Sequence, residues 1–421
     1  MKEYKKCETA LNGGNSAVFE SVKKIISDVR EDGDKALAMY SEKFGSAPLA
    51  SFRVPQEEID KAYENISDEL RSAIEYASDN IRHFAELQKE SLTPVEARET
   101  APGAFLGHRI IPVDSCCCYI PGGNHPLFST ALMLAIPAAA AGVPRVCAAV
   151  PPMKGSTLPH PATLAALKTA GASEVYCIGG AQAIAAFAYG TESIKPVSMI
   201  VGPGNKYVTE AKRQVYGQVG IDFIAGPSEV LIIADESANP KIIAADILAQ
   251  SEHDADAAGI LITTSEHIAA ETETEVERQL MALETRDTAS LSWRNNGRII
   301  VADSLDEAAE IANQAAPEHL EINTADPDCL VPKLRNFGSL FIGECSAEVF
   351  GDYSAGTNHT LPTMKAARYT GGVSVMTFLK VCTYQKITKE GVLNLAPSAA
   401  AMARSEGLAA HEKAALIRMK L

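Results

Sequence analysis

A glutamine and a histidine three residues apart are side chains that could act together on one ligand. Gln250 and His253 close the segment 245–253, whose apolar spacing predicts a helix. Residues three apart project from one helix face, so an amide oxygen and an imidazole nitrogen could meet one metal ion. Taken alone, the pair describes a polar helix end equally well, and both interpretations stay open at this point.

An acid and a histidine side by side indicate acid–base chemistry. Glu318 and His319 follow Pro317, which restricts the backbone, and they open an apolar run that predicts a strand at 319–323. The side chains of successive residues on a strand point to opposite faces of the sheet. At the strand's entry, however, both could reach one cleft, where the imidazole would accept a hydroxyl proton and the carboxylate would activate water. Taken alone, the pair is equally typical of a strand that merely begins with polar residues.

Other candidate residues lie in loops and turns. Asp352 stands in the turn-rich segment 351–362, and loops on a rigid scaffold often carry function. Glu406 and His411 lie five residues apart in a helical stretch and by themselves would be solvated surface side chains. Glycine turns at 179–180 and 202–205 follow predicted parallel strands, whose carboxyl ends bind ligands in open α/β sheets. No GxGxxG precedes a helix, so the usual dinucleotide fingerprint is missing.

Two successive series of alternating strands and helices must position these side chains. They predict two parallel sheets with right-handed crossovers. Residues before about 109 show only helical spacing, and residues after about 371 are too few to form their own core. The predicted strands are residues 145–150, 174–178, 198–201, 230–234, 259–263, 298–302, 319–323 and 339–342.

Composition excludes several classes of protein. The chain has 421 residues, of which 46% are hydrophobic, and a formal net charge of -15, which disfavours a nucleic-acid partner. The uncharged segment 128–143 contains Pro137 and many alanines, which favours a buried helix over a membrane span. The charged N-terminus precedes no apolar run, so we expect a cytoplasmic protein. Nine cysteines without metal-ligand spacing predict reduced, mostly buried thiols.

Read together, an ordered series of motifs resembles the histidinol dehydrogenase family over nearly the whole chain. One such motif could be coincidence, whereas the order and spacing of all of them identify the family. The motifs are YIPGG at 119–123, GGAQAIAA at 179–186, GPGN at 202–205, AGPSEV at 225–230, QSEH at 250–253, PEHL at 317–320, GDYSAGTNHTLP at 351–362, and His411.

The resemblance implies a role for each candidate residue. It implies a zinc site, which overturns the surface interpretation of the ligands, and it assigns acid–base catalysis to Glu318 and His319. The implied zinc ligands are Gln250, His253, Asp352 and His411. The implied NAD contacts are Tyr119, Gln182 and Asn205. The implied substrate contacts are Ser228, Gln250, His253, His319, Asp352, Glu406 and His411.

The implied reaction is a zinc-dependent, NAD-linked four-electron oxidation of a primary alcohol through the aldehyde to the carboxylate. L-Histidinol is the favoured substrate, with L-histidine as product. His319 would take the hydroxyl proton, and Glu318 would activate the water that attacks the aldehyde. All four implied ligands are present, which disfavours a non-catalytic homologue acting as a nucleotide-binding or structural dimer.

The implied fold is an α/β intertwined homodimer with two Rossmann-like parallel-sheet units and a shared active site. We expect a helical N-terminal arm at 1–18 and a C-terminal dimerisation tail at 373–421. Residues 19–118 and 229–372 would form the first unit, with zinc and catalytic residues. Residues 119–228 would form the second unit, with the NAD contacts.

Some segments resemble a paralogous branch instead. That branch includes sulfopropanediol 3-dehydrogenase, which oxidises 2,3-dihydroxypropane-1-sulfonate to sulfolactate. His125 and Arg368 could each meet a strong anion such as a sulfonate. Ser228 and Glu406 favour histidinol, so histidinol is the first expectation and the sulfonate the alternative. The segments in question are 106–109, 124–125, 366–372 and 379–385.

Overall fold

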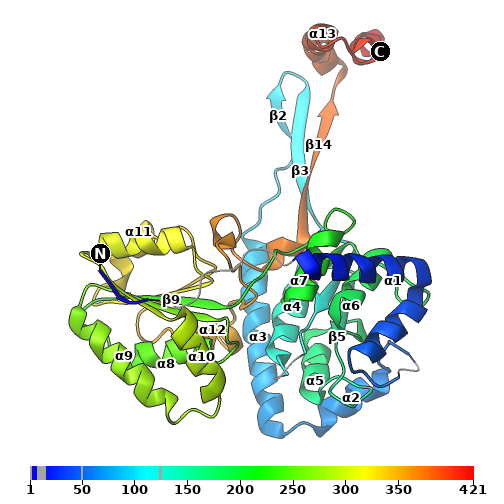
Figure 1. Ribbon diagram of the computed structural model, residues 1–421. Coiled ribbons are helices and arrows are strands. Elements are labelled where there is room, and N and C mark those ends of the chain that lie inside the picture. Colours follow the sequence, from blue (N-terminus) through cyan, green and yellow to red (C-terminus); the bar gives the residue numbers. More distant parts are fainter. Residues whose placement is uncertain (1, 7–15, 49–50, 123–125) are drawn as a thin grey trace.

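The computed structural model describes residues 2–6, 16–48, 51–122 and 126–421. Two α/β lobes lie side by side, and a narrow arm projects away from both (Figure 1). One lobe is built on a five-stranded sheet and the other on a six-stranded sheet, while a three-stranded sheet forms the stem of the arm. The predicted α/β class with two parallel-sheet units is confirmed.

The five-stranded sheet is entirely parallel, in the order β6–β5–β4–β7–β8. The chain starts at the central strand and winds outward in both directions, as in half of a dinucleotide-binding fold. Both faces are covered, which explains strands that are apolar without alternation. The strands are β4 (Ser115–Tyr119), β5 (Arg145–Val150), β6 (Glu174–Cys177), β7 (Met199–Val201) and β8 (Gly220–Ile221).

Helices between residues 16 and 215 cover this five-stranded sheet. One face packs against α2, α3, α4 and α5, and the other against α1, α6 and α7. The predicted grouping of residues 19–118 with residues 229–372 is therefore wrong, because an apolar helix face does not specify which sheet it will cover. The helices are α1 (Ser16–Lys43), α2 (Gln56–Asn65), α3 (Asp68–Glu90), α4 (Phe128–Ala141), α5 (Pro161–Ala170), α6 (Gly180–Tyr189) and α7 (Lys206–Val215).

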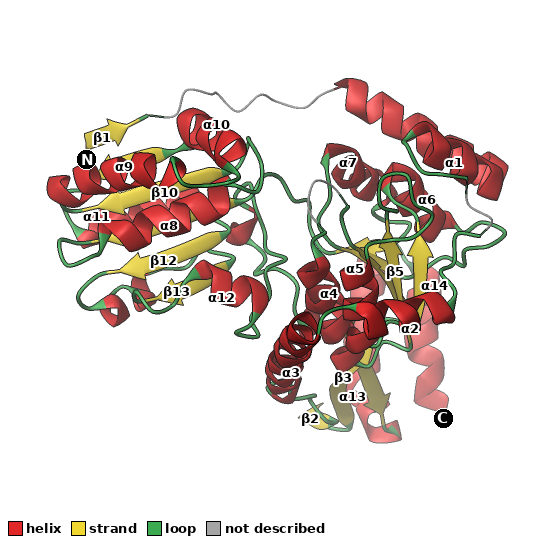
Figure 2. Ribbon diagram, turned by 90° about the horizontal axis from the view of Figure 1, so that it is seen from below, coloured by secondary structure: helices red, strands yellow, loops and turns green. Residues whose placement is uncertain are grey.

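The six-stranded sheet has the order β1–β11–β10–β9–β12–β13, and its strands are parallel except for the edge strand β1. Helices α8, α9 and α10 cover one face and α11 the other (Figure 2). The further strands are β9 (Glu229–Ala234), β10 (Ala258–Thr263), β11 (Arg298–Val301), β12 (His319–Asn323) and β13 (Ser339–Ile342). The helices are α8 (Pro240–Ser251), α9 (Glu266–Leu280), α10 (Arg286–Asn296), α11 (Leu305–Ala315) and α12 (Glu348–Tyr353).

The N-terminus is a strand and not the predicted helical arm. Strand β1 (Lys2–Lys5) pairs antiparallel with β11, with Lys2 opposite Val301. The Lys5 ammonium donates to the carbonyls of Trp293 and Gly297, both at 2.8 Å. A four-residue strand carries too little periodicity to be seen in the sequence, and here the free edge of β11 selects it. Residues 7–15 of the predicted arm lie outside the described part of the chain.

The projecting arm combines two distant segments. Strand β14 (Leu379–Ile387) pairs with β3 (Ala104–Pro112), which also pairs with β2 (Arg98–Ala101). Helices α13 (Lys389–Ser405) and α14 (Ala409–Ile417) cap the far end. Of the tail predicted at 373–421, only the residues from β14 onward lie in the arm, because Val373, Val375 and Phe378 are buried in the core of the five-stranded lobe. The arm also contains β2 and β3, which we expected in the first unit. Large apolar side chains on these helices are exposed, namely Leu393, Leu395, Met402, Leu416 and Ile417.

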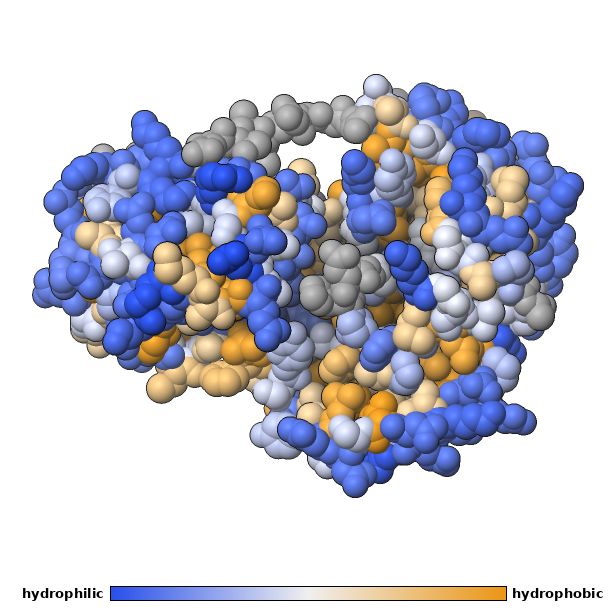
Figure 3. All heavy atoms as spheres, turned by 60° about the horizontal axis from the view of Figure 1, so that its bottom comes forward, coloured by the Kyte–Doolittle hydropathy of each residue, from blue (hydrophilic) through white to orange (hydrophobic). Residues whose placement is uncertain are grey.

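The expectations that segment 128–143 forms a buried helix and that most cysteines are buried are confirmed. The uncharged segment forms α4, whose Pro137 is buried with most of the helix. None of the described helices is long and apolar enough to cross a membrane. The cysteines that the structure describes are all free, and five of them are buried, namely Cys116, Cys117, Cys118, Cys147 and Cys177. Hydrophilic side chains cover much of the outer surface of both lobes (Figure 3).

Candidate active site and metal centre

Glu318 and His319 lie where the chain enters β12, at the amino end of the central strands of the six-stranded sheet. Both side chains are buried, and Glu318 Oε2 lies 3.7 Å from His319 Nδ1. The Glu229 amide donates to Glu318 Oε2 at 3.0 Å, which holds the carboxyl group at the start of β9. Both side chains therefore lie in one buried cluster.

The His319 imidazole is the centre of the cluster. Its Nδ1 atom lies 3.1 Å from the Gln250 amide nitrogen and 3.3 Å from the Glu229 carbonyl oxygen. Its Nε2 atom is buried without a hydrogen-bond partner among the described residues and lies 3.6 Å from Asp352 Oδ1. Helix α8 runs antiparallel to the strands, so its last turn brings Gln250 to the same edge of the sheet.

Burial and charge shift the pKa values of this cluster strongly. Burial raises the pKa of Glu318 to about 7, against the opposing effect of the His319 charge. Burial lowers the pKa of His319, but the surrounding carboxylates, Glu348 foremost, outweigh it and raise that pKa well above its usual value. Shifted acid and base groups in one buried cluster are typical of a catalytic site.

The same cluster fits a divalent metal ion. His319, Glu348 and Asp352 each offer one ligand atom, and these atoms lie within 4.8 Å of one another. Several buried carboxyl groups share one imidazole, an excess of negative charge that a cation would balance. A cation bound there would offset the carboxylate charges that raise the pKa of His319. Of His319, Glu348 and Asp352, only Asp352 is among the predicted zinc ligands. The Gln250 amide lies beside His319, and imidazole, carboxylate and amide donors together suit zinc.

The predicted zinc ligands are only partly brought together. Gln250 lies beside His319, and Asp352 Oδ1 lies 3.6 Å from His319 Nε2, so these two ligands belong to the cluster. His253 follows the end of α8 at an exposed position. His411 lies on α14 at the far end of the arm, and Glu406 follows α13 there (Figure 1). Both side chains are exposed, so one chain by itself does not carry them to the cluster.

Two residues of the site escaped sequence reasoning as individual candidates. Glu348 Oε1 lies 3.6 Å from His319 Nδ1. Glu348 stands four residues before Asp352, and this helical i,i+4 spacing of two acids could have identified it in the sequence. His359 lies in the quoted GDYSAGTNHTLP motif without having been assigned a role. Its Nδ1 atom lies 3.0 Å from the Asp352 carbonyl oxygen, and burial lowers its pKa.

The predicted NAD contacts lie at the carboxyl edge of the five-stranded sheet. Tyr119 ends β4, and its hydroxyl accepts a hydrogen bond of 3.0 Å from the Gly180 amide. Gln182 is buried in the first turn of α6, and its Oε1 atom lacks a hydrogen-bond partner among the described residues. Asn205 caps α7 by accepting from the Tyr207 amide at 2.9 Å. The glycine turns therefore lie at the strand ends predicted for them.

Contacts between the two lobes join the two edges. Thr130 Oγ1, in the first turn of α4, lies 3.2 Å from His359 Nε2. The Gly226 amide donates to Thr363 Oγ1 at 2.5 Å, beside the predicted substrate contact Ser228. Ser228 immediately precedes Glu229, whose amide binds Glu318. The predicted catalytic residues of one sheet thus approach the predicted NAD-binding edge of the other.

The residues that suggested a sulfonate substrate receive no support from the structure. Arg368 is exposed, and its guanidinium donates to the carbonyl oxygen of Gln314, a residue of α11, at 2.9 Å. This contact holds Arg368 against α11 and away from the cluster. His125 lies outside the described residues.

Comparison with known proteins agrees with the motifs. The family described as histidinol dehydrogenase matches residues 11–419. The chain is 47% identical over 404 residues to histidinol dehydrogenase of Rhizobium meliloti, covering 95% of this chain and 92% of that protein. It is 44% identical over 415 residues to a histidinol dehydrogenase homolog of Shouchella clausii, covering 99% and 97% of the two chains.

A solved structure extends this agreement to the fold. The crystal structure of histidinol dehydrogenase from Elizabethkingia anophelis superposes with a TM-score of 0.92 at 41% identity, covering 98% of this chain and 94% of that chain. The predicted class of NAD-linked alcohol dehydrogenase is thereby confirmed at the level of the family. From motifs, fold and relatives alike, this chain belongs to the histidinol dehydrogenase family.

Proposed function

We propose that this enzyme oxidises L-histidinol through the aldehyde to L-histidine, using zinc and two molecules of NAD. The observation that carries the proposal is the buried cluster in which His319 contacts Gln250, lies 3.7 Å from Glu318 and lies 3.6 Å from Asp352. Relatives that share about half of its residues bear the name of this activity.

In the first oxidation, His319 accepts the proton of the substrate hydroxyl. Its Nε2 atom makes no hydrogen bond to a described residue and lies 3.6 Å from Asp352 Oδ1, so we assign the proton transfer to this nitrogen. On the opposite side of the ring, Nδ1 would carry the hydrogen and donate it to the Glu229 carbonyl oxygen, 3.3 Å away. A histidine fixed at one nitrogen is thereby oriented for proton transfer at the other.

In the second oxidation, Glu318 acts as the base toward water. Burial raises its pKa to about 7, so its carboxyl group can both take and release a proton near neutral pH. The Glu229 amide fixes one carboxylate oxygen at 3.0 Å, which leaves the other to receive the proton of the water that attacks the aldehyde. The hydrate then loses hydride to the second NAD.

The cofactors would be held on opposite edges of the site. Gln250, His253, Asp352 and His411 of the partner subunit would hold zinc, which when bound supplies a positive charge that orients and polarises the alcohol. Tyr119, Gln182 and Asn205 would contact NAD. The N-termini of α6 and α7 at this edge favour its phosphates.

A homodimer would complete the site. The described chain leaves large apolar side chains exposed around Asp352, with Phe350 52% and Tyr353 48% accessible. The distant arm likewise exposes apolar helix faces and carries His411 and Glu406. Covering both surfaces by reciprocal exchange of arms would bring these two residues to the partner's cluster, where Glu406 and Ser228 would contact the substrate.

A side-by-side assay tests the substrate. NADH formation should be rapid with L-histidinol and at background with 2,3-dihydroxypropane-1-sulfonate, since Arg368 is bound to α11. The His319→Ala variant serves as the blank for both substrates. Preference for the sulfonate would contradict the proposal and favour the paralogous activity.

A further inference from the structure

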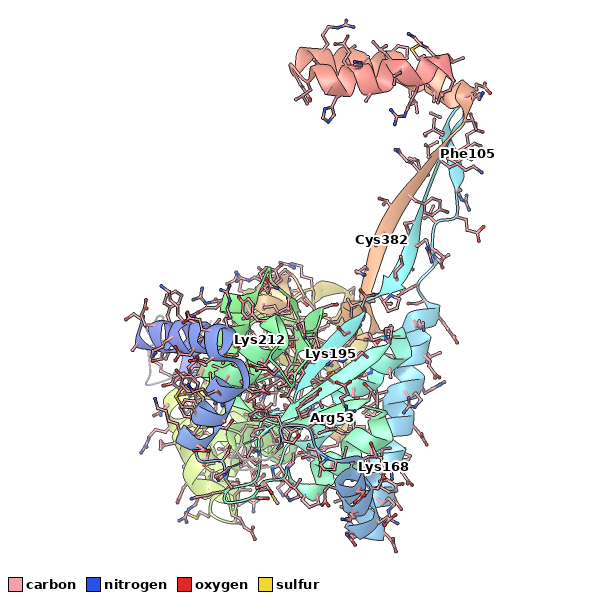
Figure 4. The ribbon with its side chains drawn as sticks, turned by 90° about the vertical axis from the view of Figure 1, so that its right-hand side faces the viewer. Arg53, Phe105, Lys168, Lys195, Lys212 and Cys382 are labelled. Atoms are coloured by element: carbon pink, nitrogen blue, oxygen red, sulfur yellow. The ribbon has the colours of Figure 1, made fainter. Side chains whose placement is uncertain are left out.

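A deeply buried ion pair lies beside the predicted NAD-binding edge and has no part in the chemistry proposed above. The Lys212 ammonium, on α7, meets the carboxylate of Asp222, which follows β8. The two side chains are 3% and 1% exposed, the lowest values among the Lys or Arg pairs with carboxylates in the described chain. Figure 4 shows Lys212 within the lobe of the five-stranded sheet.

Both members of the pair are hydrogen-bonded to one glycine. The Lys212 ammonium donates to the Gly202 carbonyl oxygen at 2.8 Å, and the Gly202 amide donates to Asp222 Oδ2 at 2.7 Å. The cation thus holds one polar group of this residue's backbone and the anion holds the other. Lys212 and Asp222 also bind each other. We call this closed set of contacts between the two side chains and the Gly202 backbone the clamp.

Gly202 occupies a conformation that needs such support. Its φ of +119° is rarely adopted by residues with a side chain, and an added Cβ would lie 2.2 Å from the Tyr119 carbonyl oxygen. Tyr119 is itself a predicted NAD contact. The turn that begins at Gly202 leads within three residues to Asn205, whose Oδ1 accepts from the Tyr207 and Val208 amides at 2.9 and 3.2 Å.

Stability alone is a poor reason for such a pair. Desolvating two charges offsets most of their attraction, and apolar side chains of similar volume often stabilise as well or better. This pair instead fixes the orientation of the Gly202 backbone, because each charge is bonded to a different polar group of that residue. A site that must approach a dinucleotide closely requires backbone held to within a fraction of an ångström.

We infer that Lys212 and Asp222 are positioning residues that fix the 202–205 turn for NAD binding. They act through Gly202 and Asn205 and need not touch the cofactor. The inference rests on the proposed function, in which Asn205 contacts NAD. Loss of the clamp would let the turn relax, and NAD would then bind a site that is no longer preformed.

The test compares neutral replacements of this pair with replacements of a second pair in the same sheet. Lys212→Met removes one charge and leaves Asp222 buried without its partner. The double variant Lys212→Met with Asp222→Asn carries no unpaired charge, so it keeps the inference testable where the single variant folds poorly. The control is Arg145→Met with Glu174→Gln, a half-buried pair 2.9 Å apart at the amino edge of the sheet.

Binding of NAD by titration calorimetry, steady-state kinetics, zinc content and thermal melting are measured for every variant. The double variant should raise the Kd and KM for NAD at least about tenfold, as expected when a site loses its preformed geometry. The KM for the alcohol and the zinc content should stay at parental values. The control should melt lower than the parent and bind NAD as the parent does.

The remaining outcomes separate the two claims, with Asn205→Ala as the reference. If Asn205→Ala weakens NAD binding but the folded double variant binds like the parent, the pair is merely structural and the inference is wrong. Equal losses of NAD affinity in the double variant and the control would overturn it as well. If neither Asn205→Ala nor the double variant changes NAD binding, the proposed NAD site itself is wrong, and the inference falls with it.

Discussion

The Gln250 amide nitrogen lies 3.1 Å from His319 Nδ1, which joins the last turn of α8 to the first residue of β12. Both side chains are buried at the amino edge of the six-stranded sheet. Ligands of open α/β folds usually bind at the carboxyl edge, and the proposed NAD contacts follow that rule. The proposed catalytic residues instead lie at the amino edge of the other sheet, an arrangement in which acid–base residues and NAD contacts would serve one substrate.

Removal of a zinc ligand should remove the metal. His253→Ala loses an imidazole donor of the proposed zinc site, so zinc bound by the purified variant should fall well below the expected value of about one per subunit. Activity should fall with it, as it should for the parent enzyme after chelation. His267→Ala, at an exposed position on α9, is the matched control and should retain both. Full zinc content and full activity in His253→Ala would reject the ligand assignment.

Glu318→Gln should slow the second oxidation more than the first. Only the second needs an activated water, and glutamine cannot take its proton. With the aldehyde supplied as substrate, the rate should fall by about 10²-fold or more, a loss typical of a missing general base. Glu236→Gln, exposed beyond β9, is the control and should leave both steps unchanged. Equal slowing of the two oxidations would show that Glu318 has another role.

Asp246→Asn should stabilise the fold most at alkaline pH. Asp246 is buried on α8, and burial raises its pKa from 3.8 to about 6. Such an acid contributes stability that is present below pH 3.8 and lost as the pH rises to about 6. Thermal melts should therefore place the variant above the parent at about pH 8 and level with it at about pH 4. Asp256→Asn, an exposed control, should melt like the parent at both; a pH-independent gain for Asp246→Asn would contradict this account.

Local pattern was enough to predict much of the catalytic unit. The strand at His319 and the helix that ends near Gln250 follow from apolar periodicity, and the motifs assigned chemistry to their ends. Glu348 was missed because a buried acid in a short helix resembles a surface acid in sequence. Only the packing of α12 beside β12 shows that its carboxylate meets His319.

Long-range pairing could not be predicted. Strand β1 depends on a free edge of β11 nearly 300 residues away, and β14 depends on β3 at the other end of the chain. The residues of β1 and β14 do not indicate which strand each of them will pair with. For the same reason, the apolar faces of α1, α2 and α3 predicted helices correctly but not the sheet that they cover.

The shared site predicts complementation between inactive subunits. An inactive His411→Ala chain mixed with an inactive His319→Ala chain should recover activity, because one site of each mixed dimer receives both intact residues. Random reassortment makes half the dimers mixed, so activity should reach about one quarter of the parental value per subunit. No recovery after verified subunit exchange would show that His411 serves its own chain.

The most direct test of the central claim counts NADH per alcohol consumed. With limiting L-histidinol and excess NAD, the enzyme should form two NADH and one L-histidine for each histidinol, with no free aldehyde, because Glu318 and His319 share one buried cluster. Absorbance of NADH and chromatography of the products give both quantities from the same reaction. One NADH per histidinol, with aldehyde released into solution, would contradict the double oxidation and the role assigned to Glu318.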